Sequence, residues 1–248
     1  MPVFDALLLA AAAFFAGILN TVAGGGTFLT FPALVFTGVP VVAANATSAV
    51  AVFPGYLGGA VGFRREITAF ERKRLLRILL ATAAGGLIGS LLLLVSSNRA
   101  FSVVVPFLLL IATLAFAFGD TLQAWAQRSR LAEGWTGTVL VSIYGGYFNG
   151  GLGIVLLALF AMWGMRDLNV MNGLKNALSF VLSAISVATF AAAGIVAWPQ
   201  ALLMMAAAML GGYAGAPLAR ALPRQVVRGT VIAVGAVTSV IFFARLFD

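Results

Sequence analysis

Long apolar runs separated by short polar segments dominate the chain. Six of these runs have the length of about 20 residues that carries an α-helix across a bilayer. They lie at residues 43–63, 75–97, 101–119, 170–194, 199–222 and 226–243. In lipid, the backbone of a single run can satisfy its hydrogen bonds only as a helix. The pattern therefore predicts an all-α, polytopic membrane protein.

Two further apolar regions are interrupted by glycine clusters. Residues 4–37 contain three glycines at 24–26, and residues 137–164 contain an Asn-Gly-Gly-Leu-Gly run at 149–153. The second region is too short to cross twice, because two crossings need roughly 40 residues. Each region is therefore either one broken span or a re-entrant hairpin that enters and leaves on the same side.

The basic residues distinguish these two alternatives. Six arginines and lysines lie within residues 64–77, and short basic loops face the cytoplasm. The uncharged connection at 195–200 then lies outside, and the arginines within 220–228 lie inside. These assignments agree only if residues 137–164 begin and end inside, so we expect a hairpin there.

The two halves of the chain repeat one another. Residues 17–20 (Gly-Ile-Leu-Asn) match 146–149 (Gly-Tyr-Phe-Asn) 129 positions later, and 85–89 match 211–215 after 126 positions. Each half then has one broken hairpin and three crossings, about eight hydrophobic segments in all. Because three is odd, the halves face opposite ways, as the inverted repeats of secondary transporters do. We expect a first repeat, a cytoplasmic linker and a second repeat at 1–119, 120–134 and 135–248.

Small residues on three spans predict close helix packing. The glycines concerned lie within residues 55–62, 85–89 and 211–215. Packing is the stronger interpretation of these glycines, and contact with a ligand is the weaker one.

Composition narrows the function classes. Of 248 residues, 62% are hydrophobic and 9% charged, whereas soluble domains have about 25% charged residues. The chain has no Cys and no His, so we expect no cofactor, no metal site and no histidine proton relay. The net charge of +8 lies between apolar runs rather than along a solvated stripe, which indicates a lipid bilayer and no nucleic acid as partner.

The two breaks are the first candidate site. Irregular backbone at membrane depth is tolerated only where protein or a cavity satisfies it, and paired breaks are typical of transporter substrate sites. The N-terminus of the helix after each break favours an oxyanion. Alternatively, the glycines form tight turns and the asparagines cap them. The candidate substrate-binding residues here are Asn20, Thr21, Gly24, Gly25, Gly26, Thr27, Asn149, Gly150, Gly151 and Gly153.

Polar residues at the start of the next span form the second candidate group. They are Asn45, Thr47 and Ser48 in the first half and Asn172, Lys175 and Asn176 in the second, 127 positions later. The latter three share one helix face. A charge within apolar sequence marks a functional candidate, although the stem of Lys175 can instead extend to the headgroups. Near the second break, Tyr144 and Tyr147 either line a cavity or form interhelical hydrogen bonds.

Taken together, these motifs resemble the TauE/SafE-type sulfite exporter family, also called the toluenesulfonate uptake permease family. The similarity covers nearly the whole chain and is carried by residues 16–26, 45–48, 150–153 and 174–176. It implies a multi-pass transporter of the bacterial inner membrane. The implied substrate is a small sulfur-containing or organic anion, such as sulfite, a sulfonate or sulfoacetate.

We therefore expect an alternating-access exporter of a small oxyanion and not an enzyme. The seven carboxylates lie at predicted span ends or in loops, and a potential negative inside drives an anion outward without a proton relay. A small-anion channel is one alternative, because a pore can use the same breaks. An intramembrane enzyme is another, for which Ser179 and Lys175, at i and i+4, are the one close nucleophile and base pair.

Overall fold

The computed structural model of the protein is helical wherever the chain is described. The described residues are 1–22, 25–68, 70–129, 134–221 and 224–244. Within these ranges the chain forms twelve helices and no strand. The all-α prediction is confirmed.

Each half begins with two helices around a glycine break and continues with three long helices. The first half comprises α1 (Val3–Val22), α2 (Thr27–Phe36), α3 (Val41–Gly62), α4 (Arg64–Thr68), α5 (Arg72–Val95), α6 (Asn98–Ala117) and α7 (Gly119–Ser129). The second half comprises α8 (Trp135–Tyr147), α9 (Leu152–Met162), α10 (Leu168–Ala192), α11 (Trp198–Ala221) and α12 (Arg224–Ala244).

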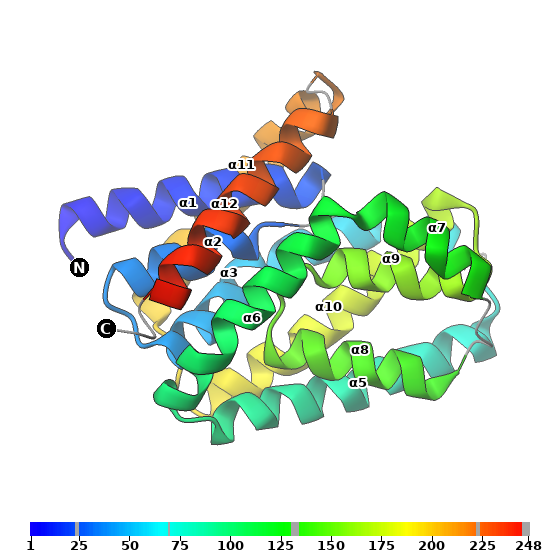
Figure 1. The fold of residues 1–248 in the computed structure, drawn as a ribbon, viewed down its shortest axis with the longest axis horizontal. Helices are drawn as coiled ribbons and strands as arrows, with labels where there is room; N and C mark the ends of the chain where they lie inside the picture. The colour runs from blue at the N-terminus through cyan, green and yellow to red at the C-terminus, as the bar shows by residue number, and fades with distance from the viewer. Residues whose placement is uncertain (23–24, 69, 130–133, 222–223, 245–248) are drawn as a thin grey trace.

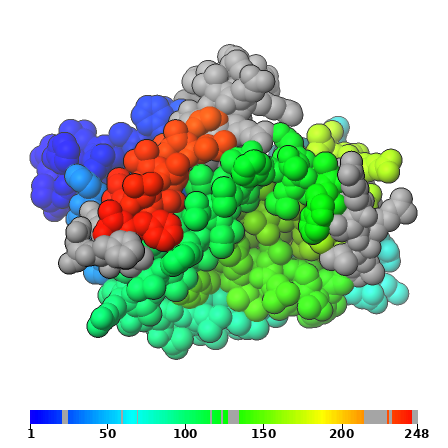
Figure 2. All heavy atoms as spheres, in the orientation of Figure 1, coloured from blue at the N-terminus to red at the C-terminus, as the bar shows by residue number. Residues whose placement is uncertain are grey.

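All six predicted spans are helices, with ends within three residues of the predicted ends. In the part of the chain that is described, five helices are long and apolar enough to cross a bilayer, namely α1, α3, α5, α6 and α10. The helices α6 and α12 lie side by side on one face (Figure 2), where Phe107, Ile111 and Val237 are exposed. Exposed apolar faces of this kind suit lipid, so the chain is a polytopic membrane protein.

The first arms of the two hairpins differ in length. There are 20 residues in α1 and 13 in α8, or about 30 Å and 20 Å at 1.5 Å per residue. The helices α8 and α9 are therefore two short arms. In contrast, α1 is long enough to cross a bilayer alone, because its apolar sequence continues without interruption to Asn20. The two arms begin at opposite ends of the molecule (Figure 1).

The second arms, α2 and α9, end in the same way. Gly38 and Gly164 follow them with φ of 84° and 79°, a left-handed conformation that glycine adopts without strain. The N–H groups of Val39 and Met165 each donate to a carbonyl five residues back, at 3.0 and 3.1 Å. This is the hydrogen bond of a Schellman motif, and it turns the chain out of each hairpin.

Each first arm packs against a helix of the other half. In Figure 1, α8 lies along α5. The helix α1 packs against α11. Glycines allow the approach: a Cβ on Gly146 would overlap the carbonyl of Gly86, and one on Gly211 would overlap the carbonyl of Phe14. The predicted packing role is therefore confirmed for residues 85–89 and for Gly211, while the surroundings of Gly215 lie outside the described part of the chain.

The predicted packing at residues 55–62 is wrong for three of its glycines. A Cβ on Gly55, Gly58 or Gly62 would meet nothing within 4 Å. This face of α3 is exposed at its C-terminal end, where no described helix covers it.

The predicted linker at 120–134 is partly helical, because its first ten residues belong to α7. This helix packs against α9 and is two-sided, with Trp125 exposed and Ala126 fully buried. An exposed Trp beside apolar helices is typical of the membrane interface.

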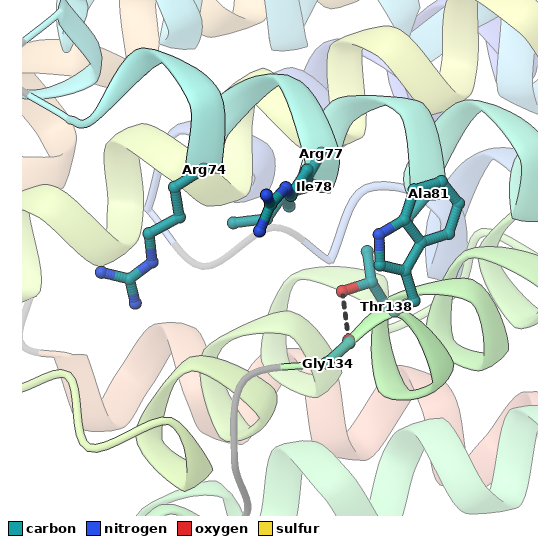
Figure 3. Close-up of a pocket in the computed structure, with 7 residues that line it drawn as sticks. Arg74, Arg77, Ile78, Ala81, Gly134 and Thr138 are labelled. Atoms are coloured by element: carbon teal, nitrogen blue, oxygen red, sulfur yellow. Dashed lines mark hydrogen bonds between the residues drawn. The ribbon is translucent and has the colours of Figure 1, made fainter.

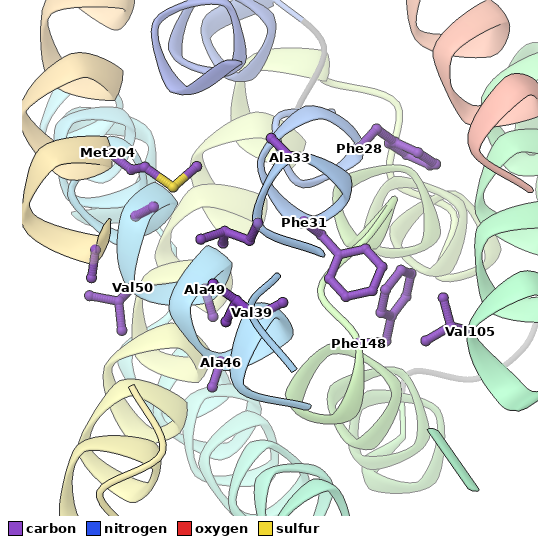
Figure 4. Close-up of a cluster of buried hydrophobic side chains, with 14 of the residues drawn as sticks. Phe28, Phe31, Ala33, Val39, Ala46, Ala49, Val50, Val105, Phe148 and Met204 are labelled. Atoms are coloured by element: carbon purple, nitrogen blue, oxygen red, sulfur yellow. The ribbon is translucent and has the colours of Figure 1, made fainter. Parts of the chain in front are cut away.

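The core lies at the level of the breaks and joins both halves (Figure 4). The ring of Phe31 in α2 stacks on Phe242 of α12 with centroids 5.5 Å apart and meets the edge of Phe148 at 5.9 Å. Phe31 is fully buried and Phe148 nearly so. The backbone before the second break is therefore fixed by aromatic packing against the first hairpin.

Candidate functional site

The first break is closed by a local cap. The Oδ1 atom of Asn20 accepts a hydrogen bond from the backbone N–H of Gly26 at 2.8 Å, and a Cβ on Gly26 would lie 2.6 Å from Asn20 Nδ2. Gly25, Gly26 and Thr27 are buried. Asn20 therefore holds the start of α2, as the capping alternative expects. The side chain of Thr21 and the whole of Gly24 lie outside the described residues.

The hydroxyls of α3 next to this break have protein partners. The Ser48 Oγ and Thr30 Oγ1 atoms are hydrogen-bonded at 2.6 Å, which ties α3 to α2. Thr47 Oγ1 accepts from the N–H of Ala197 at 3.0 Å, which ties α3 to the second half. Both candidates thus connect elements of the fold.

The second break has a different hydrogen-bonding pattern. Gly151 has φ of 71° and precedes α9, and the hydroxyl of Tyr144 donates to the carbonyl of Gly150. Asn149 is buried, and its Nδ2 contacts Tyr56 Oη of α3 at 3.3 Å. Within the described residues, Asn149 Oδ1 has no hydrogen-bond partner.

A small cavity, here called the central cavity, lies between this break, α3, α8 and α10. Its volume is about 10 Å³, roughly enough for one water molecule. Its polar lining comes from both halves and consists of Asn45, Asn149, Ser183 and Ser186. Asn45 is fixed by its Nδ2, which donates to the carbonyl of Tyr147 at 2.9 Å. The structure thus brings two predicted site residues, Asn45 and Asn149, together.

The two serines of the central cavity were missed from the sequence. Ser183 Oγ has no partner among the described residues, and Ser186 Oγ is hydrogen-bonded to Ser90 of α5 at 2.8 Å. They continue the face of Asn172, Asn176 and Ser179 at alternating steps of three and four residues, which is the spacing of one helix face. Extending that spacing along the span would have identified them.

Lys175 lies away from the central cavity. Its Nζ donates to Asn172 Oδ1 at 3.0 Å, toward the start of α10. Its stem lies against the second break, since a Cβ on Gly153 would sit 3.4 Å from Lys175 Cδ. Eight residues separate it from Ser183, which is about 12 Å along the helix. Asn176, beside it, is half-buried.

Neither tyrosine candidate lines the central cavity. Besides the bond of Tyr144 to the second break, Tyr147 Oη is hydrogen-bonded to Ser96 Oγ at 3.3 Å. The ring of Tyr147 packs edge-on against Phe101 with centroids 5.4 Å apart. Tyr147 therefore makes the interhelical contacts of the alternative interpretation, whereas Tyr144 bonds within its own hairpin.

Comparison with known proteins identifies a family. The model of the family described as sulfite exporter TauE/SafE matches residues 9–242. A probable membrane transporter protein of Haemophilus influenzae is 28% identical over 229 residues, covering 88% of this chain and 87% of that protein. The probable membrane transporter protein YfcA of Escherichia coli is 25% identical over 242 residues, covering 92% and 85%. No solved structure matches the chain significantly.

Proposed function

The chain belongs to the sulfite exporter TauE/SafE family of membrane transporters, and we propose that it exports a small oxyanion by alternating access. The proposed substrates are sulfite, a sulfonate or sulfoacetate. The proposed location is the bacterial inner membrane, because the similar transporters come from bacteria. The observation that carries the proposal is the central cavity, where Asn45 and Asn149 of opposite halves meet beside the second break.

As placed, the atom of Asn149 without a partner among the described residues is its amide oxygen, an acceptor, and a turn of the amide would present a donor to the cavity instead. The oxygen and nitrogen of an asparagine amide exchange places on a half-turn of the terminal bond, and a tyrosine hydroxyl both donates and accepts. After such a turn, Tyr56 donates to the amide oxygen of Asn149 at the position of the present 3.3 Å contact. The amide N–H group then joins the hydroxyl of Ser183 as a donor facing the cavity, and donors are what an oxyanion requires.

The proposed transport cycle rests on inverted repeats at residues 1–119 and 135–248. Three features support this arrangement. Each of α1 and α8 packs against a helix of the opposite half, the two helices start at opposite ends of the molecule, and α2 and α9 end in the same way. The central cavity, at about 10 Å³, is smaller than the proposed substrate. Binding then requires α3, α10 and the second break to separate.

Export is proposed to be driven by the membrane potential. Each negative charge moving outward gains about 2.3 kcal/mol per 100 mV, so no proton relay is needed. The test is sulfite or sulfonate flux from proteoliposomes with an imposed potassium-diffusion potential. We expect flux to rise with an inside-negative potential, to saturate and to show counterflow. Flux without a response to potential contradicts the electrogenic mechanism, and the absence of counterflow would favour a channel.

Lys175 gives a second test of the anion's path. A Lys175→Met variant keeps a flexible stem against Gly153 and removes the charge, whereas Lys175→Arg keeps the charge. We expect the methionine variant to bind sulfite more weakly, because it removes a positive charge about 12 Å along α10 from the central cavity, and the arginine variant to retain most binding. Equal binding by both variants would assign Lys175 to the headgroup region alone.

A further inference from the structure

A second polar cavity lies at the start of α5 and α8, away from the central cavity. It has a volume of about 100 Å³ and is lined by Arg74, Arg77, Trp135 and Thr138, among others. In Figure 3 both arginines project from α5 beside the first turn of α8, where Thr138 Oγ1 donates to the carbonyl of Gly134. Guanidinium groups bind oxyanions through paired N–H donors. We call this cavity the arginine pocket.

One face of α8 connects the arginine pocket to the central cavity. Thr138 lines the arginine pocket, and Gly145 and Gly146, two turns later, line the central cavity. Between them, Ser142 is fully buried, and its hydroxyl has no hydrogen-bond partner within the described residues. From Thr138 to Gly146 the distance along the helix is about 12 Å.

In the described part of the chain, α5 and α10 also carry buried hydroxyls without a hydrogen-bond partner. On α5, Ala81 lines the arginine pocket, and the adjacent Thr82 is buried with an unpartnered hydroxyl. Four side-chain atoms are buried without a partner in the described part of the chain, and they belong to Thr82, Ser142, Asn149 and Ser183. All four lie between these two cavities or at the central one. Buried polar groups without partners are rare and each requires an explanation.

Packing alone does not explain these hydroxyls. The repeat places Leu9 and Ala13 of α1 at the positions of Thr138 and Ser142, 129 residues earlier, and both are fully buried and apolar. At the position of Thr82, α11 has Ala208, 126 residues later. The α1–α11 interface therefore achieves the same glycine-mediated contact without hydroxyls.

From this asymmetry we infer that the α5–α8–α10 interface is the route by which the anion reaches the central cavity. Arg74 and Arg77 gather the anion at its basic end, and Thr82, Ser142 and Ser183 pass it inward by hydrogen bonds. This inference rests on the proposed export function. In the present conformation the route is closed, because a Cβ on Gly85 would already lie 2.5 Å from the carbonyl of Val139. Transport then requires α8 to move away from α5.

The first test removes hydroxyls that have no structural partner. We expect Ser142→Ala, and Thr82→Val independently, to lower sulfite flux about tenfold, the effect of losing one hydrogen bond to a charged group. Because these hydroxyls are unpaired, the melting temperature stays the same or rises. The matched control is Ser239→Ala, a buried hydroxyl that donates to the carbonyl of Gly235 within α12, with unchanged flux. Wild-type flux in both route variants overturns the inference.

The second test concerns the arginine pocket. We expect Arg77→Gln to raise the half-saturating sulfite concentration several-fold at the basic face while leaving the maximal rate nearly unchanged. The assay is run in liposomes of phosphatidylcholine alone and with phosphatidylglycerol. An effect in both supports capture of the free anion. An effect only with phosphatidylglycerol shows that the pocket holds a lipid phosphate and overturns its role in capture. If the wild-type protein moves no sulfur oxyanion at all, the proposed function fails instead.

Discussion

Asn20 and Asn149 occupy equivalent positions of the two halves, 129 residues apart, but their side chains bond in different directions. Asn20 bonds within its own hairpin, to the N–H of Gly26. Asn149 instead reaches Tyr56 of the other half, and its amide oxygen, beside the central cavity, has no partner among the residues that the structure describes. Both breaks therefore begin at an asparagine, but the two asparagines have different partners. Asn20 holds the first hairpin, whereas Asn149 is the residue that we propose to face the substrate.

The helices that lead to the two breaks differ in the same sense. In α1 the buried face is apolar, with Leu9 and Ala13, and the helix has the length of a full span. In α8 the corresponding face has Thr138 and Ser142, and the helix is shorter. Both approach the opposite half through glycines. Close glycine packing is thus common to the α1–α11 and α5–α8 interfaces, whereas buried hydroxyls occur in the α5–α8 interface.

The largest loss of stability is expected at the glycine contacts that both interfaces share. Gly146→Ala and Gly211→Ala each place a methyl group on a backbone carbonyl of the opposing helix, and overpacking of this kind costs about 1–3 kcal/mol or more. We expect both variants to lose most folded protein, measured by size-exclusion chromatography and thermal unfolding in detergent. Gly55→Ala, with nothing within 4 Å, is the control and should be as stable as wild type or slightly more. A wild-type melting temperature in either variant contradicts the close contact of α8 with α5 or of α11 with α1.

A second prediction separates the two asparagines. Asn20→Ala removes the hydrogen bond that the Gly26 N–H donates to the Asn20 side chain, which costs about 1 kcal/mol, so the melting temperature falls while flux per folded molecule stays near wild type. Asn149→Ala removes the amide from the central cavity, and we expect about a tenfold loss of flux with a smaller thermal shift, because its bond to Tyr56 is long at 3.3 Å. Sulfite flux and thermal unfolding are measured on the same preparations. The reverse pattern would place the site at the first break.

The long spans could be predicted closely because their signal is length. An apolar run of about 20 residues has few alternatives in lipid, and all six helices end within three residues of prediction. The hairpins were harder, because the apolar run that forms α1 is itself nearly as long as a span, and the glycine break after it does not show whether that run crosses alone or forms a short arm. The glycines at 55–62 misled for a related reason: a small-residue face shows that close packing is allowed, and only the tertiary structure shows whether a helix is there.

Half of the central cavity could be predicted. Asn45 and Asn149 lie next to motifs with a recognisable pattern. Ser183 and Ser186 of this cavity, and Ser142 on the proposed route to it, are single hydroxyls in apolar helices. There serine normally bonds to its own helix, as Ser239 does. What distinguishes Ser142 and Ser183 is the missing bond, and a missing bond has no sequence signal.

The smallest expected effect tests the attachment of the second arms to the following spans. The repeat aligns Ser48 with Lys175, 127 residues later. Ser48 is hydrogen-bonded to Thr30 of α2, and Lys175 lies against Gly153 of α9, so both tie a second arm to the next helix. We expect Ser48→Ala and Thr30→Val each to lower stability, with a coupling of about 1 kcal/mol in a double-mutant cycle. Flux per folded molecule should stay within about twofold of wild type, because the bond holds the arm and its residues line neither the central cavity nor the arginine pocket. A large loss of flux in Ser48→Ala without a thermal shift would instead give the first half a direct part in substrate binding.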